Sequence, residues 1–190
     1  SGAVASYYYQ HCSDLLKKVD PNHMYLGSRL HSSAKNNPSI LAAAEQYLDI
    51  ISINYYGSWA VSEKNSNQWA ALKKPFIITE FYTKAMDANM DNISGAGWIV
   101  KTQEERGIHY QNFGLTLLTN KNCVGWHWFR YQDNDPSDNT ADPSNKDSNK
   151  GVVDTKYNWY APLSIKMKEL NTNIYTIIHF LDQSNVPFPR

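Results

Sequence analysis

A single carboxylate at the end of an apolar segment is the residue best placed for chemistry. Residues 75–81 read PFIITEF, so Glu80 closes a run of β-branched and aromatic residues. Burying an ionised carboxylate without a partner costs on the order of several kcal/mol. At the mouth of a barrel strand the same group can meet substrate and water, and barrel enzymes place catalytic residues there. We expect Glu80 to be catalytic; the alternative is a surface or ion-pair carboxylate.

Other polar and aromatic side chains fall at the ends of neighbouring predicted strands. Side chains alternate between the two faces of a strand, which predicts a set on the face of Glu80: Arg29, His31, Asn54, Tyr56 and Trp128. The same alternation turns His127 and Phe129 toward the covering helices. The set is chemically coherent: it offers a carboxylate, a phenol to hydrogen-bond it, a cation, an imidazole and an aromatic platform.

Alternating helix and strand patterns must position these residues. Strands are expected at Met24–Leu30, Asp49–Asn54, Pro75–Glu80 and Cys123–Phe129. Helical spacing of apolar residues predicts helices around 8–19, 38–47, 69–72, 102–118 and 163–181, with Asn37 as an N-cap and Thr102 with Glu105 as a capping box. The pattern indicates an α/β fold of parallel βα units. A full (β/α)8 barrel needs about 250 residues, so the chain is either a small open sheet or half a barrel.

Composition narrows the function. The 190 residues carry 18 basic and 18 acidic side chains, so no global charge favours nucleic acid or an anionic membrane. No apolar run is long enough to span a bilayer, and no metal-ligand spacing is found. The 13 tyrosines and 6 tryptophans suit sugar recognition, although many will be ordinary core aromatics. Residues 1–6 lack the features of a secretory leader and read like the middle of a longer chain.

Three segments resemble a known group of enzymes. Asp49–Gly57 (DIISINYYG), Phe76–Phe81 (FIITEF) and Gly125–Asp133 (GWHWFRYQD) resemble the sixth, seventh and eighth strands of clan A retaining glycoside hydrolases. Ser148–Val153 (SNKGVV) is similar to bacterial β-agarases and related galactan hydrolases. The resemblance implies that residues 1–190 are the C-terminal half, four βα units, of a (β/α)8 catalytic domain. It also implies a secreted or periplasmic location.

The resemblance assigns roles to individual residues. Glu80 matches the nucleophile, Tyr56 or Tyr55 matches the tyrosine that holds it, and Trp128 matches the platform under the reacting sugar. The implied substrate is a β-linked galactose polymer such as agarose or porphyran, and no cofactor is implied. Asn54, Arg29 and His31 are candidate substrate contacts, with Arg29 the group expected to meet a sulfate.

One catalytic group is missing from this pattern. In clan A the acid/base is a Glu preceded by Asn, and the sequence contains no Asn-Glu pair. We therefore expect the chain alone to be inactive, with its open face covered by a complementary half-barrel segment or by a homodimer. Two alternatives stay open: an exo-glycosidase of the β-galactosidase or β-glucuronidase type, and a non-catalytic carbohydrate-binding remnant.

Overall fold

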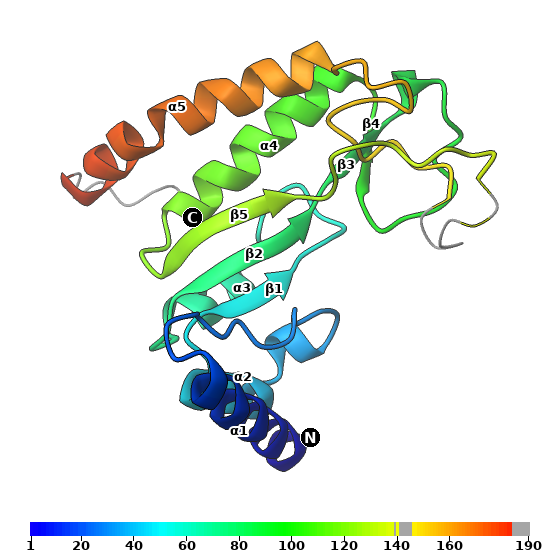
Figure 1. Cartoon of the computed structure of the whole chain (residues 1–190). Coiled ribbons are helices and arrows are strands. Elements are labelled where there is room, and N and C mark those ends of the chain that lie inside the picture. Colours follow the sequence, from blue (N-terminus) through cyan, green and yellow to red (C-terminus); the bar gives the residue numbers. More distant parts are fainter. Residues whose placement is uncertain (139, 141–145, 184–190) are drawn as a thin grey trace. The chain divides into compact units, whose positions relative to one another are not determined.

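The computed structural model describes residues 1–138, 140 and 146–183, and has the expected α/β character (Figure 1). The helices of the described residues are α1 (Gly2–Val19), α2 (Pro38–Tyr47), α3 (Glu63–Ala70), α4 (Gln103–Leu118) and α5 (Ala161–Gln183), with short 3-10 turns at Ala34–Asn36 and Met86–Ala88. The strands are β1 (Ile51–Asn54), β2 (Phe76–Phe81), β3 (Thr83–Ala85), β4 (Trp98–Val100) and β5 (Cys123–Trp128). The polar stretch from Gln132 to Lys150 is rich in Asp, Asn, Ser and Pro, a composition that predicts a loop. Part of this stretch, 139 and 141–145, lies outside the described residues.

The chain forms two compact units. The first unit comprises Ser1–Tyr55, Ser62–Glu80 and Asn120–His127, and the second comprises Tyr56–Val61, Phe81–Thr119 and Trp128–Arg190. The chain therefore passes from one unit to the other near the carboxyl ends of β1, β2 and β5.

The first unit contains a three-stranded sheet in the order β1-β2-β5. β1 and β2 run parallel, with Ile51 opposite Phe76 and Ile53 opposite Ile78. These four apolar residues are fully buried, and Phe76 packs on Trp69 of α3, with ring centroids 5.4 Å apart. Burial of this kind is the main favourable term in folding. α1 and α2 pack against each other in the same unit (Figure 1).

The strand predicted at Met24–Leu30 is wrong except at its last residue. Leu30 alone forms a parallel bridge, to Ile53. The preceding backbone bonds to side chains and neighbouring loops instead of to a strand partner, and Gly27 adopts φ +64°, which interrupts an extended chain.

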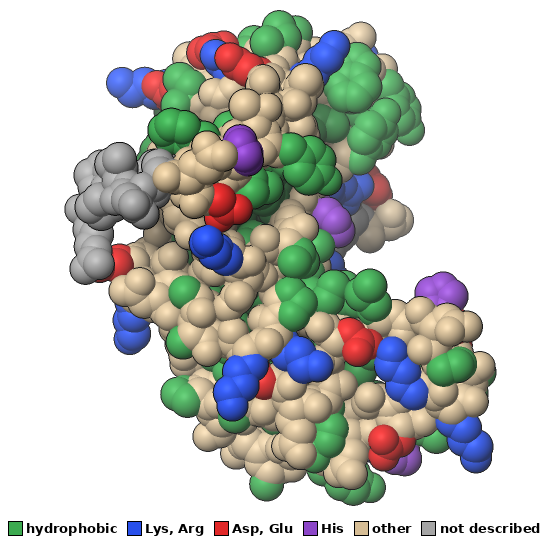
Figure 2. Space-filling model, turned by 90° about the vertical axis from the view of Figure 1, so that its left-hand side faces the viewer, with side chains coloured by type: hydrophobic (Ala, Val, Ile, Leu, Met, Phe, Trp, Pro, Cys, Tyr) green, Lys and Arg blue, Asp and Glu red, His purple; other side chains and the backbone are tan. Residues whose placement is uncertain are grey.

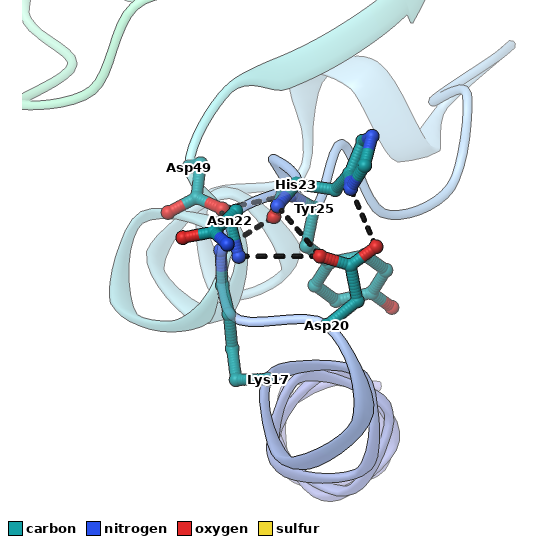
Figure 3. A network of polar contacts seen from close by, with 6 residues as sticks. All are labelled: Lys17, Asp20, Asn22, His23, Tyr25 and Asp49. Carbon is teal, nitrogen blue, oxygen red and sulfur yellow. Dashed lines mark hydrogen bonds and ion pairs between the residues drawn. The ribbon is translucent and has the colours of Figure 1, made fainter.

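A polar network holds this irregular segment to the end of α1 (Figure 3). Asp49 accepts a hydrogen bond of 2.7 Å from the backbone N–H of Tyr25 and pairs with Lys17 Nζ at 2.8 Å. Lys17 also donates to the carbonyl of His23 at 2.7 Å. The hydrogen bond from Lys17 and, to a smaller extent, the one from the backbone N–H of Tyr25 hold the pKa of Asp49 below its usual value.

The second unit packs α4 against α5 and adds a short parallel pair, β3 with β4. The sequence pattern did not predict this pair, because three-residue strands carry too little alternation to be read. α4 begins as predicted: Thr102 accepts a hydrogen bond of 3.2 Å from the N–H of Glu105. The Glu105 carboxylate, however, accepts from the N–H of Lys101 rather than returning to Thr102.

A buried polar cluster fixes the inner side of α4. Arg106 is fully buried and donates to the carbonyls of Thr83 (2.9 Å) and Gly151 (2.8 Å). Asp133 accepts from the N–H of Gly151 (2.6 Å) and from the hydroxyl of Tyr160 (2.6 Å). Burial lowers the pKa of Arg106 to about 10, so the guanidinium keeps its charge at neutral pH.

The surface carries charges of both signs. Figure 2 shows basic and acidic side chains interspersed with hydrophobic ones on the face it presents. Among the described residues, no helix combines the length and apolarity that a membrane crossing requires.

Candidate active site

Glu80 lies one residue before the end of β2 and is 8% exposed. The register shifts here, since Ile53 faces Ile78 whereas the next residue, Asn54, faces Glu80. Thr79 is thus an extra residue on β2, a bulge of the kind that re-aims side chains near active sites. Simple alternation from Phe76 therefore does not carry through to Glu80.

Arg29 is the observed ionic partner of Glu80. Its Nη1 forms an ion pair and hydrogen bond with Glu80 Oε1. The Glu80 side chain is 10% exposed and that of Arg29 is 59% exposed. A carboxylate so far removed from water needs a charged or hydrogen-bonding partner, and Arg29 supplies one while keeping much of its own surface accessible. Two residues predicted for one site are therefore brought together.

Ser52 fixes the backbone that carries Arg29. Its Oγ lies 3.0 Å from the carbonyl oxygen of Leu26 and 3.2 Å from that of Ser28. The N–H of Leu30 donates to the Ser52 carbonyl at 2.8 Å, and the N–H of Asn54 donates to the Leu30 carbonyl at 2.9 Å. The segment on both sides of Arg29 is thus clamped to β1, which aims a partly exposed side chain at a buried carboxylate.

Asn54 lies beside this pair at the end of β1. Its Oδ1 accepts a hydrogen bond of 2.8 Å from the Thr79 hydroxyl, which also lies 3.3 Å from the carbonyl of Ile53. The amide is therefore oriented by the bulge residue next to Glu80. His31 is exposed, and its carbonyl accepts from the N–H of Ala34 at 3.0 Å; its ring stays a predicted member of the site.

The two candidate tyrosines have different surroundings. Tyr55 is buried, its ring meets Trp69 edge-on with centroids 5.6 Å apart, and its hydroxyl accepts from the N–H of Ser62 at 3.1 Å. Those contacts serve the packing of α3. Tyr56 belongs to the second unit, is partly exposed, and packs edge-on against Tyr82 at 5.5 Å.

Trp128 faces α4, so the predicted alternation at the end of β5 is wrong. Its ring lies 5.3 Å from the Arg106 guanidinium and meets Phe81 edge-on at 5.4 Å, and its Nε1 donates to the carbonyl of Lys150 at 2.7 Å. A buried guanidinium gains from an aromatic face beside it, which explains the direction of the ring. Trp128 nevertheless stays partly exposed.

Sequence reasoning missed a second aromatic group in this unit. Phe129, predicted to face the helices, instead lies 6.1 Å from Tyr82, and the fully buried Lys150 has its Nζ 5.4 Å from the Phe129 ring and 5.6 Å from the Tyr82 ring. With Tyr56 these residues form a cluster of three rings and one cation. Tyr82 directly follows the FIITEF segment, and Lys150 lies in the SNKGVV segment, so the motif positions could have pointed to both residues.

His109 is a structural histidine of the same unit. It is 1% exposed, its Nε2 lies 3.2 Å from the carbonyl of Ser58, and its ring stacks with Phe113 at 5.7 Å. Burial lowers the pKa of His109 to about 4, so the imidazole is neutral at pH 7 and cannot serve as a cation there.

Comparison with known proteins places these features in context. The sequence matches no protein-family model. It is 33% identical over 164 residues to β-agarase B of Vibrio sp. (strain JT0107), which covers 85% of this chain and 16% of that protein. The crystal structure of BpGH50 superposes with a TM-score of 0.87 at 42% identity, covering 96% of this chain and 38% of that one. A solved exo-β-agarase gives a TM-score of 0.82 at 30% identity, covering 93% of this chain and 23% of that one.

The matches extend over nearly the whole chain, but the chain spans about a sixth of the length of the curated agarase. The expected resemblance to agarases is thereby confirmed at the level of sequence and of fold. The chain is a relative of the agarase-type glycosidases, the O-glycosyl hydrolases.

Proposed function

We propose that the chain is the C-terminal half of a (β/α)8 catalytic domain that hydrolyses a β-linked galactan such as agarose with retention of configuration. The observation that carries the proposal is Glu80, a nearly buried carboxylate paired with Arg29 at the end of a parallel strand, in a chain similar to β-agarases over most of its length. Parallel strands followed by helices are the repeating unit of such a barrel.

The proposed chemistry is a double displacement. The Glu80 carboxylate attacks the anomeric carbon and forms a glycosyl ester while the glycosidic C–O bond breaks and the leaving oxygen takes a proton from an acid. Water, giving its proton to the same group, then cleaves the ester and frees Glu80. Retaining enzymes hold the two carboxyl groups about 5–5.5 Å apart. The second carboxyl would come from outside this chain, because the expected Asn-Glu pair is missing from the sequence.

The remaining site residues are proposed as substrate contacts. Asn54, His31, Tyr56 and Trp128 occupy strand ends or the turns that follow them. Of the two tyrosines, Tyr56 is the better candidate, since the Tyr55 hydroxyl is engaged by Ser62. Arg29 is more than half exposed, which leaves it able to meet a sulfate or hydroxyl of the substrate as well as Glu80.

A partner completes the proposal. A complementary half-barrel segment would supply the acid/base carboxyl and cover the open face, with a homodimer as the other way of covering it. A general acid is worth about 10²–10⁴-fold in rate, so the chain by itself is expected to show no turnover. A secreted or periplasmic location accords with a polysaccharide substrate.

The test is a chimera in which this chain replaces the matching 164-residue region of β-agarase B. Reducing ends released from agarose are measured for the chimera and its variants. Glu80→Gln is expected to lower kcat by at least about 10³-fold, because an amide cannot form the ester. Glu63→Gln, an exposed carboxylate in the first turn of α3, is the matched control and should change kcat less than twofold.

Two results would overturn the proposal. One is a Glu80→Gln chimera that keeps more than a tenth of the parent activity. The other is robust agarose turnover by the isolated 190-residue chain, since the acid/base group would then have to lie within it.

A further inference from the structure

An apolar groove on the second unit is not used by the chemistry above. It has a volume of about 620 Å³ and is lined chiefly by Trp59, Met86, Trp98, Ile99 and Ile108. Trp98 is 46% exposed and Trp59 is 37% exposed. Small-molecule sites fall in the range of roughly 300–1,000 Å³ and combine apolar walls with a few polar groups, so the size and lining fit a ligand.

Both tryptophans of the groove are fixed in place. Trp98 begins β4, which pairs with β3 opposite Thr83. The segment leading to it is anchored by the buried Lys84, whose Nζ donates to the carbonyls of Asn92 (3.2 Å), Ser94 (2.8 Å) and Gly95 (3.0 Å).

Trp59 is fixed from α4. Its ring meets the buried His109 edge-on, with centroids 5.3 Å apart. Its carbonyl accepts a hydrogen bond of 3.3 Å from Asn112 Nδ2. The two indoles are therefore presented by ordered backbone, which lowers the entropy cost of binding.

The charge around the groove indicates an uncharged ligand. Lys101 and Glu105 are the charged residues that line it, one of each sign. The Glu105 carboxylate moreover accepts a hydrogen bond of 2.6 Å from the N–H of Lys101. A phosphate or a polyanion is disfavoured because Lys101 is the one basic residue among the described residues that line the groove. A cation is disfavoured because the one acidic residue among them, Glu105, already accepts a hydrogen bond.

We propose that this groove is a second sugar-binding site, which holds one or two residues of an uncharged β-linked galactan against Trp98 and Trp59. Indole faces stack on the C–H faces of sugar rings and leave the hydroxyls in water, which suits a half-exposed apolar groove better than a fully buried one. The choice of a galactan rests on the proposed function. Every residue that lines the groove belongs to the second unit, whereas Glu80 belongs to the first.

The experiment titrates the 190-residue chain carrying Glu80→Gln with neoagarotetraose, and separately with cellotetraose. Binding is followed by tryptophan fluorescence and by the indole N–H signal of Trp98 in NMR spectra. Trp98→Ala is expected to weaken neoagarotetraose binding at least about tenfold, and Trp98→Phe should restore most of it. Trp159→Ala is the matched control, because Trp159 is also exposed in this unit but does not line the groove.

Each other outcome contradicts the proposal. If Trp98→Ala binds neoagarotetraose with unchanged affinity, or if the parent binds cellotetraose with equal affinity, the groove is not a galactan-binding site. A Trp98 signal that moves with protein concentration and not with oligosaccharide assigns the groove to a second copy of the chain. Because Glu80 is already replaced, a failure here leaves the chimera test of the nucleophile untouched, and the reverse also holds.

Discussion

Arg29 and Glu80 are two predicted site residues that the structure brings into contact. Sequence alternation suggested that the two share a face, and the structure joins them by an ion pair. The sequence did not predict how the two side chains are oriented toward each other. The bulge at Thr79 and the hydrogen bonds of Ser52 depend on strand register and backbone contacts, which the alternation of side chains does not reveal. The direction of Trp128 was mispredicted for a similar reason, because Arg106, distant in sequence, draws the ring toward α4.

His109 gives a pH-dependent prediction at the same scale. Its pKa is about 4 in the folded chain and near 6.5 when unfolded, so the unfolded state binds more protons between these values. Stability from the neutral ring is complete above pH 6.5 and falls as the pH is lowered toward 4. At about 1.4 kcal/mol per pKa unit, the difference of about 2.5 between the two values corresponds to a loss of about 3.5 kcal/mol.

Urea denaturation at pH 7 and pH 4.5 measures this effect. The free energy of unfolding of the parent should fall more between the two pH values than that of His109→Gln, which has no titrating ring. A variant with the same pH dependence as the parent would contradict the assignment. His31→Gln, an exposed position in the first unit, is the control for replacing a histidine outside the second unit.

Among the elements, the starts of α2 and α4 followed the sequence closely, whereas the helix expected around 69–72 lies at Glu63–Ala70. The N-caps at Asn37 and Thr102 were identified from residue type and spacing alone, since a side-chain oxygen before an apolar helical stripe has a local cause. The first predicted strand failed because its partners, Asp49 and Ser52, lie some 25 residues away and bind its backbone through side chains. β3 and β4 were missed because they are held by pairing across a loop rather than by their own pattern.

The cap of α4 is the element-scale prediction. Thr102→Ala removes the acceptor for the N–H of Glu105 and should lower the free energy of unfolding by about 1 kcal/mol. Thr172→Ala, an exposed position inside α5, should be neutral or slightly stabilising because alanine favours a helix. Equal effects of the two changes in urea denaturation would show that the cap contributes nothing.

At the scale of the whole molecule, the sequence predicted the strands β1, β2 and β5 and the α/β class. Solved structures that include agarases share this fold over most of the chain. The division into two units was not predicted, because compactness depends on contacts between distant segments such as α4 and α5. The chain spans a minor part of the proteins it resembles. We infer that Glu80, the proposed nucleophile, becomes useful only when a second carboxyl is brought to it.

The most direct measurement is covalent trapping in the agarase chimera. A 2-fluoro agaro-oligosaccharyl fluoride slows hydrolysis of a glycosyl ester, so the enzyme accumulates with the sugar attached to its nucleophile. Peptide mass spectrometry is expected to find the label on Glu80, within the peptide that contains Phe76–Phe81. A label on another carboxylate, or inactivation without any ester, would contradict the account.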